Sequence, residues 1–210
     1  MGRINMKTLP KLFQIVELTR SQPQYGYALS GIKKNDLSSL AEHHYLVTFI
    51  AWQLAAHLNK LGAKLDVKKV LEFCLVHDLG EIFGGDIAFP YARVNKKAKS
   101  LAKAFEEENQ NFLAKYFGNT ATEYKNLTLE IMDAKTDEGL VAKVADYVEC
   151  FEYKKYINCL NANDYMITKE KLGSYIAKMK NPLVKKELSK FVDEWLKYVK
   201  NNPHGSTIFG

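Results

Sequence analysis

The residues of this chain best suited to chemistry are two histidines and two aspartates at three places. His77 and Asp78 are adjacent at the end of an apolar run, His43 lies well before them and Asp146 well after them. Two neutral imidazoles and two carboxylates give a divalent ion four ligands with a formal charge of −2, and they leave positions open for water and substrate. Mixed nitrogen and oxygen ligands suit zinc, manganese, cobalt, nickel or iron better than calcium.

An open metal site of this kind predicts hydrolysis. A bound divalent ion lowers the pKa of a water ligand from about 15.7 toward about 7 and polarises a phosphoryl oxygen. Glu81 follows His77 by four residues, which on a continuous helix places it one turn further on the same face. We expect Glu81 to accept a proton from the attacking water or to orient it. Asp86, in the turn Gly84-Gly85-Asp86, is expected to hydrogen-bond the same water or the substrate.

Each of these residues also has an ordinary structural explanation. A histidine on an amphipathic helix usually packs in the core, Glu81 suits a helix end at the surface, and Asp86 suits a turn. Asp146 fits such an explanation least well, because its neighbours are apolar and an unpartnered carboxylate is costly to bury. Taken together, the residues favour a site over separate structural roles.

Helical periodicity runs through nearly the whole chain and predicts an all-α protein. Three expected helices carry the ligands: His43 lies in the first turns of one, His77 and Asp78 at the end of the next, and Asp146 on a later one. Helices that converge in a bundle core can hold a metal between them. The expected helices cover 9–18, Ser38 or Ser39 to Gly62, Asp66 to about Gly84, 95–117, Thr136 or Asp137 to about Cys159, and Asn181-Pro182 onward; 22–39 and 86–90 are expected to be loops.

Length and composition are those of an ordinary globular protein, since 47% of the 210 residues are hydrophobic. We expect one domain over 1–200 and a tail over 201–210. The net charge of +6 is spread along the chain, whereas nucleic-acid-binding domains usually gather their charge into a patch. The charge alone permits a nucleic acid or a phosphorylated small molecule, and we expect no nucleic-acid partner. No segment predicts a membrane span, and three widely spaced cysteines without a CxxC motif indicate a reducing, cytoplasmic location.

The motifs resemble those of the HD-domain phosphohydrolases, and most closely those of their 5′-deoxynucleotidase branch. The similarity covers about residues 10–160 and rests on the pattern of a histidine, a His-Asp pair and a later aspartate. The matching segments are Ala41-Glu42-His43-His44-Tyr45, His77-Asp78-Leu79-Gly80-Glu81, Gly85-Asp86-Ile87 and Val144-Ala145-Asp146.

The resemblance implies a single helical bundle of the HD-domain type with a divalent ion (Mn, Co, Zn, Ni, Fe or Mg). It implies that the ion is bound by His43, His77, Asp78 and Asp146, and that Glu81 and Asp86 position or activate the water. The implied reaction removes the 5′-phosphate of nucleoside monophosphates, and the implied assembly is a homodimer.

The chain departs from the family where the substrate is contacted. The family carries a phosphate-binding arginine, next to an aromatic residue, in the loop before the first histidine, and Gln24 stands where some relatives have it. Arg20 is the nearest substitute, because a guanidinium can bind phosphate in a bidentate manner, and Tyr27 and Lys96 are further candidate substrate contacts. His44 is expected to be structural or to support the ligands, since it points about 100° away from His43 on a helix.

Besides nucleic-acid binding, the weakest alternative, two other functions remain open from the sequence. One is hydrolysis of another phosphate compound, such as a guanosine polyphosphate or a cyclic nucleotide. The other is a non-catalytic HD domain that binds a nucleotide or a metal. The presence of Glu81 argues against the second, because a binding module has no need of a carboxylate that activates water.

Overall fold

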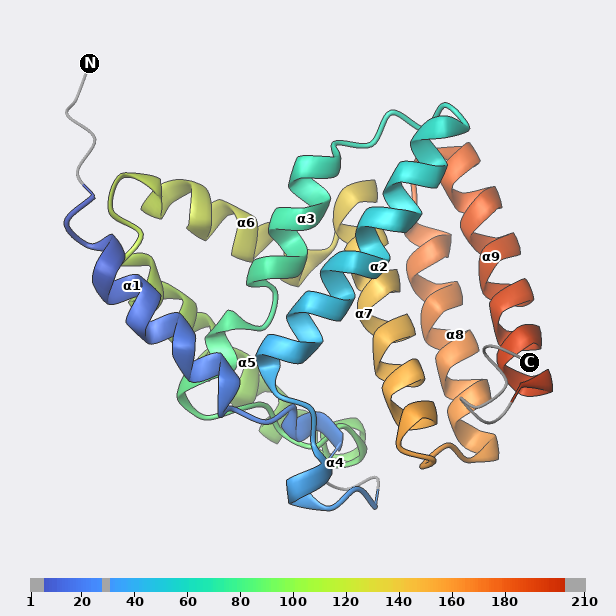
Figure 1. The fold of residues 1–210 in the computed structure, drawn as a ribbon, viewed down its shortest axis with the longest axis horizontal. Helices are drawn as coiled ribbons and strands as arrows, with labels where there is room; N and C mark the ends of the chain where they lie inside the picture. Colours follow the sequence, from blue (N-terminus) through green and yellow to red (C-terminus); the bar gives the residue numbers. More distant parts are fainter. Residues whose placement is uncertain (1–5, 28–30, 203–210) are drawn as a thin grey trace. The chain divides into compact units, whose positions relative to one another are not determined.

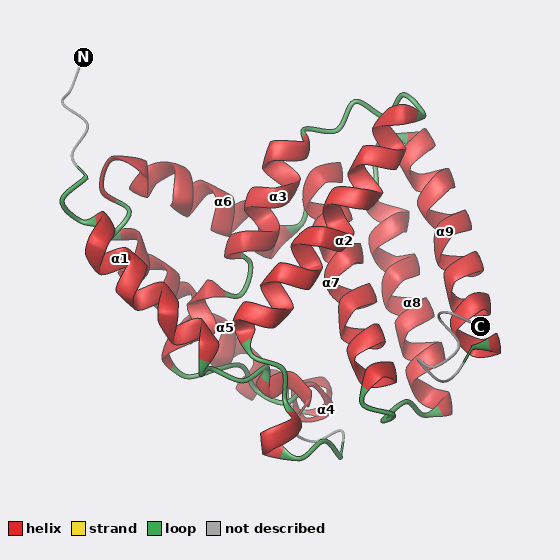
Figure 2. Cartoon of the chain, viewed as in Figure 1, coloured by secondary structure: helices red, strands yellow, loops and turns green. Residues whose placement is uncertain are grey.

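The structure is a computed structural model that describes residues 6–27 and 31–202, without the side chains of Lys34 and Phe89. Within these ranges every regular element is a helix (Figures 1 and 2). Extended pairing in the described part of the chain is limited to one antiparallel bridge between Pro23 and Ser39. The all-α prediction is therefore confirmed. Most of the predicted tail, 203–210, lies outside the described residues.

The chain divides into two compact units. Unit 1 comprises Met1–Tyr45 and Leu75–Met132, and unit 2 comprises Leu46–Cys74 and Asp133–Gly210. Helices α2, Leu40–Lys60, and α3, Val67–Val76, each begin in one unit and end in the other.

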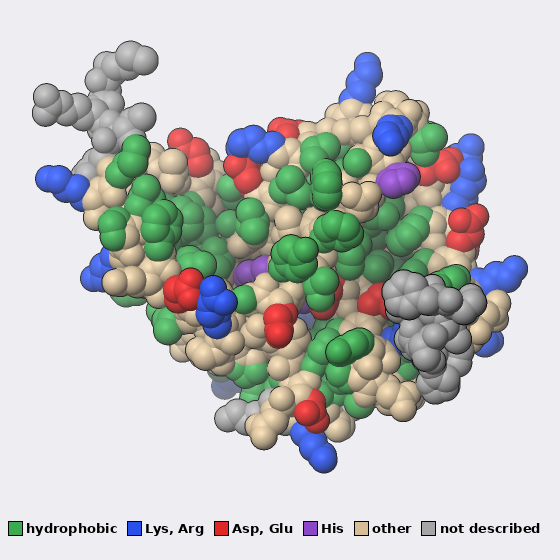
Figure 3. All heavy atoms as spheres, viewed as in Figure 1, with side chains coloured by type: hydrophobic (Ala, Val, Ile, Leu, Met, Phe, Trp, Pro, Cys, Tyr) green, Lys and Arg blue, Asp and Glu red, His purple; other side chains and the backbone are tan. Residues whose placement is uncertain are grey.

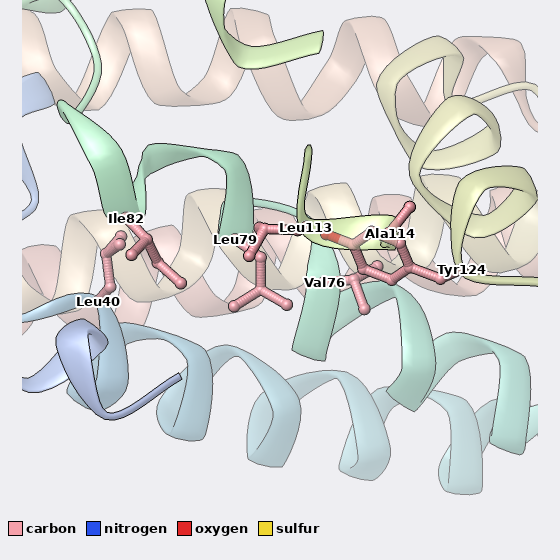
Figure 4. Close-up of a cluster of buried hydrophobic side chains, with 7 residues drawn as sticks. All are labelled: Leu40, Val76, Leu79, Ile82, Leu113, Ala114 and Tyr124. Carbon is pink, nitrogen blue, oxygen red and sulfur yellow. The ribbon is translucent and has the colours of Figure 1, made fainter. Parts of the chain in front are cut away.

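Unit 1 is organised around a hydrophobic cluster beside the turn that follows α3. Its members come from the start of α2, the end of α3, the 3-10 helix η4 and helices α5 and α6 (Figure 4). They are Leu40, Val76, Leu79, Ile82, Leu113, Ala114 and Tyr124. Besides the start of α2 and the end of α3, the described part of unit 1 contains α1 (Leu9–Val16), η1 (Glu17–Arg20), η2 (Tyr25–Tyr27), η3 (Lys34–Asp36), η4 (Leu79–Phe83), α4 (Phe89–Val94), α5 (Lys96–Ala114), η5 (Gly118–Thr120) and α6 (Ala121–Asp133) except for its last residue.

The start of α2 is fixed by a reciprocal cap. The Glu42 backbone N–H donates to Ser39 Oγ, and the Ser39 backbone N–H donates to Glu42 Oε2 at 2.8 Å. This arrangement satisfies two donors that the first turn of a helix otherwise leaves unpaired. The predicted cap at Ser38 or Ser39 is thus found at Ser39, one turn before His43.

Unit 2 contains three helices that lie side by side, α7 (Asp137–Tyr156), α8 (Ala162–Lys178) and α9 (Pro182–Asn201) (Figure 1). Each begins at a side-chain cap, from Thr136, Asn161 and Asn181 respectively. The predicted starts at Thr136 and Asn181 are confirmed. The predicted stop of α2 at Gly62 is also confirmed, because Gly62 adopts a φ of 99°, which glycine tolerates far better than other residues.

Two predicted boundaries are wrong. The third helix ends at Val76, not near Gly84, so His77 and Asp78 occupy a turn and Glu81 lies in η4. Side chains of α5 make this break possible: Gln110 donates to the Val76 carbonyl and Asn109 donates to the Gly80 carbonyl at 2.7 Å. These donors satisfy carbonyl groups that a continued helix would have bonded itself.

The second wrong boundary lies in the segment predicted as a loop from Asp86 to Pro90. Helix α4 already begins at Phe89, with Pro90 in its first turn. Proline is accepted there because the first helical N–H groups have no partner within the helix. Among the described residues, no helix combines the length and the apolar character needed to cross a membrane.

Candidate metal centre

Three ligand atoms of unit 1 converge at the start of α2 and the turn after α3. The Nε2 atoms of His43 and His77 lie 3.2 Å apart. Asp78 Oδ2 lies 3.5 Å from the first nitrogen and 3.3 Å from the second. Both histidines are buried, whereas the Asp78 side chain keeps 18% of its surface exposed. The structure thus brings three of the four predicted ligands together around one point.

The size of this triangle matches the requirement of a divalent transition metal. Zinc binds histidine nitrogen and carboxylate oxygen at about 2.0–2.2 Å, so two of its ligand atoms lie about 2.8 to 3.6 Å apart, depending on the angle between them. The separations of 3.2, 3.3 and 3.5 Å fall within this range. The donor set and its spacing therefore fit a metal ion, with imidazole and carboxylate as its ligands.

His44 lies beside this triangle, where its expected structural or supporting role stays a prediction. Its ring centroid is 5.0 Å from that of His77 and 6.0 Å from that of His43. His44, His77 and Asp78 each offer a ligand atom within 4.8 Å of one another. Burial, together with the neighbouring His77, lowers the pKa of His44 to about 3. His44 is therefore a neutral imidazole at pH 7, which is the form that can bind a metal.

Glu81 lies next to the triangle as a buried carboxyl group. Its backbone N–H donates to the Asp78 carbonyl at 2.9 Å, and its Oε2 is buried without a hydrogen-bond partner among the described residues. Burial raises the pKa of Glu81 well above its ordinary value, and the negative charges of Asp78, Asp86 and Glu106 raise it further. An unpartnered buried oxygen at this place is consistent with a bound water or ligand.

Asp86 lies at the exposed turn before α4. Its Oδ1 accepts the backbone N–H of Ile87 at 2.6 Å, and its charge contributes to the raised pKa of Glu81. Gly85, next to it, has a φ of 71°, and a Cβ built there would meet Gln22 Nε2 at 2.8 Å. Glycine is thus favoured at this position by its backbone conformation, and the flexible Gln22 side chain would have to shift to admit a Cβ.

Asp146, the fourth predicted ligand, belongs to α7 in unit 2. Its carboxylate accepts from Lys143 Nζ at 3.4 Å and from Cys150 Sγ at 3.6 Å. The Asp146 side chain is 15% exposed. In the sequence, the apolar neighbours of Asp146 suggested a costly buried carboxylate without a partner. Lys143 and Cys150 are the partners that the sequence did not show.

The candidate substrate contacts differ in their settings. Arg20 pairs with Glu17 through Nε and Oε2 at 2.5 Å, and its side chain is 73% exposed. Tyr27 is buried at the end of η2, and Lys96 is exposed at the first residue of α5.

Besides Lys143 and Cys150, which contact Asp146, a third residue that touches a predicted ligand was not expected from the sequence. Gln24 is buried, and its side-chain amide donates to Asp78 Oδ2 at 3.2 Å across 54 residues of sequence. No local periodicity signals a contact over such a separation. The only sequence signal was the position of Gln24 in the loop where the resembling family places its arginine.

The fold and the grouped His and Asp side chains define an all-helical protein with a candidate metal centre. The sequence model of the HD-domain family matches residues 18–194 of this chain. The chain therefore belongs to the HD-domain family, the helical metal-dependent phosphohydrolases that its motifs resemble.

Relatives and solved structures agree with this family. A 5′-deoxynucleotidase of Dictyostelium discoideum is 28% identical over 157 residues, which cover 71% of this chain and 80% of that protein. A 5′-deoxynucleotidase of Vibrio vulnificus is 24% identical over 153 residues, covering 69% of this chain and 75% of the relative. A conserved hypothetical protein from Pyrococcus furiosus has a similar structure, with a TM-score of 0.64, 26% identity and coverage of 91% and 99% of the two chains. An HD-domain phosphohydrolase from Listeria innocua shares the fold, with a TM-score of 0.67, 22% identity and coverage of 93% and 89%.

Proposed function

We propose that this HD-domain protein is a metal-dependent phosphohydrolase that removes the 5′-phosphate of deoxyribonucleoside monophosphates. The observation that carries the proposal is the convergence of His43 Nε2, His77 Nε2 and Asp78 Oδ2 beside the buried carboxyl group of Glu81. The substrate class is supported by the relatives, which bear the name 5′-deoxynucleotidase.

In this proposal His43, His77 and Asp78 hold the divalent ion, and Asp146 of α7 is its fourth ligand. The ion supplies an acidified water and polarises the phosphoryl oxygen. The Lys143 ammonium is held 3.4 Å from Asp146 Oδ2, so it offsets the carboxylate charge before an ion binds. Two carboxylates and two neutral imidazoles then match the charge of a divalent ion.

Glu81 is proposed to take the proton of the attacking water. A general base works best when its pKa is close to the working pH, and burial together with Asp78 and Asp86 raises the pKa of Glu81 in that direction. Asp86 is proposed to orient the water or the substrate from the exposed turn before α4. Both roles use carboxylates whose positions are set by η4 and the Gly85 turn.

The phosphate dianion requires a cation, and Arg20 is the proposed one. Its guanidinium is exposed, and its ion-pair partner within the described part of the chain is Glu17, on the same 3-10 helix. A surface pair of this kind contributes little to stability, so a phosphate can replace Glu17 with a bidentate contact. Tyr27 and Lys96 are proposed as secondary substrate contacts.

The test is phosphate release from a panel of deoxyribonucleoside and ribonucleoside 5′-monophosphates with Mn²⁺, Co²⁺ or Zn²⁺. A guanosine polyphosphate and a cyclic nucleotide in the same panel address hydrolysis of other phosphate compounds. We expect Asp78→Ala and Glu81→Ala to abolish release, whereas Asp193→Ala, which removes only an exposed pair with Lys169, leaves it unchanged. Full activity in Asp78→Ala would refute the proposal, and metal binding without turnover of any substrate would favour a non-catalytic HD domain.

We also propose that the protein forms a homodimer through an exposed apolar face of α2. Leu46, Phe49 and Trp52 lie on one face of this helix and keep 43%, 48% and 46% of their surfaces exposed. Figure 3 shows hydrophobic side chains at the surface in the region where Figure 1 draws α2. No charged residue lies between Leu46 and Trp52, so the face suits an uncharged partner such as its own copy. Sedimentation of Trp52→Glu should show monomers if this face is the interface, and unchanged dimers would exclude it.

A further inference from the structure

The carboxylate of Asp78 is held by a side chain from a distant loop. Gln24 Nε2 donates to Asp78 Oδ2 at 3.2 Å, and Gln24 is only 7% exposed. The same oxygen lies 3.3 Å from His77 Nε2 and 3.5 Å from His43 Nε2. Gln24 therefore bonds the very oxygen that completes the triangle of ligand atoms, and it does so entirely within unit 1.

The backbone around Gln24 is tied to the start of α2. The Gln24 N–H donates to the Ser38 carbonyl at 2.8 Å, and the Leu40 N–H donates to the Gln22 carbonyl at 2.9 Å. These two bonds flank the bridge between Pro23 and Ser39. Ser39 is also the cap of α2, one turn before His43. The loop, the helix that carries His43 and the carboxylate of Asp78 are thus joined by a continuous set of hydrogen bonds.

The chemical character of Gln24 suits a partner of a ligand. A carboxylate oxygen has two lone pairs, so it can accept an amide N–H and still bind an ion. The amide is neutral, and it fixes the orientation of the carboxylate without placing a positive charge next to the ion. Outer partners of this kind typically change metal affinity about 10-fold to 100-fold when they are removed.

We propose that Gln24 is a positioning residue that orients Asp78 for metal binding. The inference rests on the metal site of the proposed function, but it does not depend on which substrate is hydrolysed. It assigns a role in metal affinity to a loop residue that donates no ligand atom of its own.

The experiment measures Co²⁺ binding to the chelator-treated full chain by calorimetry and by visible absorption. Gln24→Met removes the donor and keeps the length of the side chain, and Gln24→Ala is a second variant that cannot clash. The matched control is Gln22→Met, which makes the same change two residues away in the same segment. Thermal unfolding of each metal-free variant is recorded alongside.

We expect the Co²⁺ dissociation constant to rise about 10-fold to 100-fold in both Gln24 variants and to stay unchanged in Gln22→Met. Unchanged Co²⁺ affinity in the Gln24 variants overturns the inference, and a lower unfolding temperature with unchanged affinity overturns it equally, because Gln24 would then be merely structural. If wild type binds no Co²⁺, both the inference and the proposed metal site fail. If the Gln24 variants weaken Co²⁺ binding and no phosphate is released from any substrate, only the proposed function fails.

Discussion

Replacement of Glu81 by glutamine should make the metal-free protein more stable and the enzyme less active. Burial, with the nearby charge of Asp78, raises the pKa of Glu81 in the folded chain. At pH values above the unfolded pKa, the unfolded chain therefore binds fewer protons than the folded one at this residue. Stability falls as the pH rises from that value to the raised pKa of the folded state.

The size of the effect follows from the linkage between proton binding and folding. Each unit by which the pKa of Glu81 is raised costs about 1.4 kcal/mol of folding free energy once the pH exceeds the folded pKa. Glu81→Gln resembles the protonated side chain and escapes this cost. Its advantage over wild type should be absent at pH 4, grow through the raised pKa and then level off.

Two assays test the prediction. Urea unfolding of chelator-treated wild type and Glu81→Gln between pH 4 and pH 8 measures the free energy of unfolding. Phosphate release measures the activity, which should fall about 10²-fold to 10⁴-fold with the loss of a general base. If Glu81→Gln were less stable than wild type at pH 8, the assignment of Glu81 as a buried carboxyl group with a raised pKa would be refuted. Adding back a divalent ion should reduce the stability difference, because a nearby cation favours the ionised carboxylate.

Three further predictions concern other parts of the chain. Ser39→Ala should lower the free energy of unfolding by about 1 kcal/mol, the usual cost of losing a helix cap, and urea unfolding against Ser189→Ala, an exposed serine of α9, measures it. Gly85→Ala should destabilise the protein by about 1–2 kcal/mol through its positive φ, and the flexible Gln22 side chain should move aside at little cost. Gly173→Ala has open space and no positive φ, so it should not destabilise the protein. Equal effects of the two changes on urea unfolding would contradict this account. Burial and the charge of Asp146 raise the pKa of the Cys74 thiol to about 12. In a variant with Cys150 and Cys159 replaced by alanine, a thiol reagent at pH 8 should therefore label Cys74 only after urea is added. Labelling of the native protein at the rate of a free thiol would refute the burial of Cys74.

The sequence predicted several elements whose signals are local, but the helices α6 and α8 were not expected, although α8 begins at a local capping box of Asn161 and Asp164. Ser39 and Glu42 form the expected cap of α2, and Thr136 and Asn181 begin their helices as predicted, because a cap involves residues two or three positions apart. The grouping of His43 with His77 and Asp78 was also predictable, since these residue types at those places suit one ion. The role of these residues as ligands, like the single domain expected over 1–200, stays a prediction.

The features that the sequence did not reveal depend on contacts between distant segments. The break after Val76 requires Asn109 and Gln110 of α5, which bond the carbonyl groups that the break releases. Because of this break, His77 and Glu81 do not lie one turn apart on a continuous helix, as their spacing predicted. Both residues nevertheless lie at the site. The contact of Gln24 with Asp78 spans 54 residues and follows no periodicity.

The division of unit 1 into two stretches has a consequence for the order of folding. His43 and Gln24 lie in the first stretch, His77 and Asp78 lie in the second, and residues 46–74 between them belong to unit 2. Bringing such separated segments together costs the entropy of loop closure before any contact between them stabilises the chain. These contacts therefore form slowly relative to local helices. The ligand triangle therefore exists only once both stretches have joined, and an ion that binds it stabilises the joined state alone. The rate of metal binding during refolding would then report how fast the two stretches of unit 1 come together.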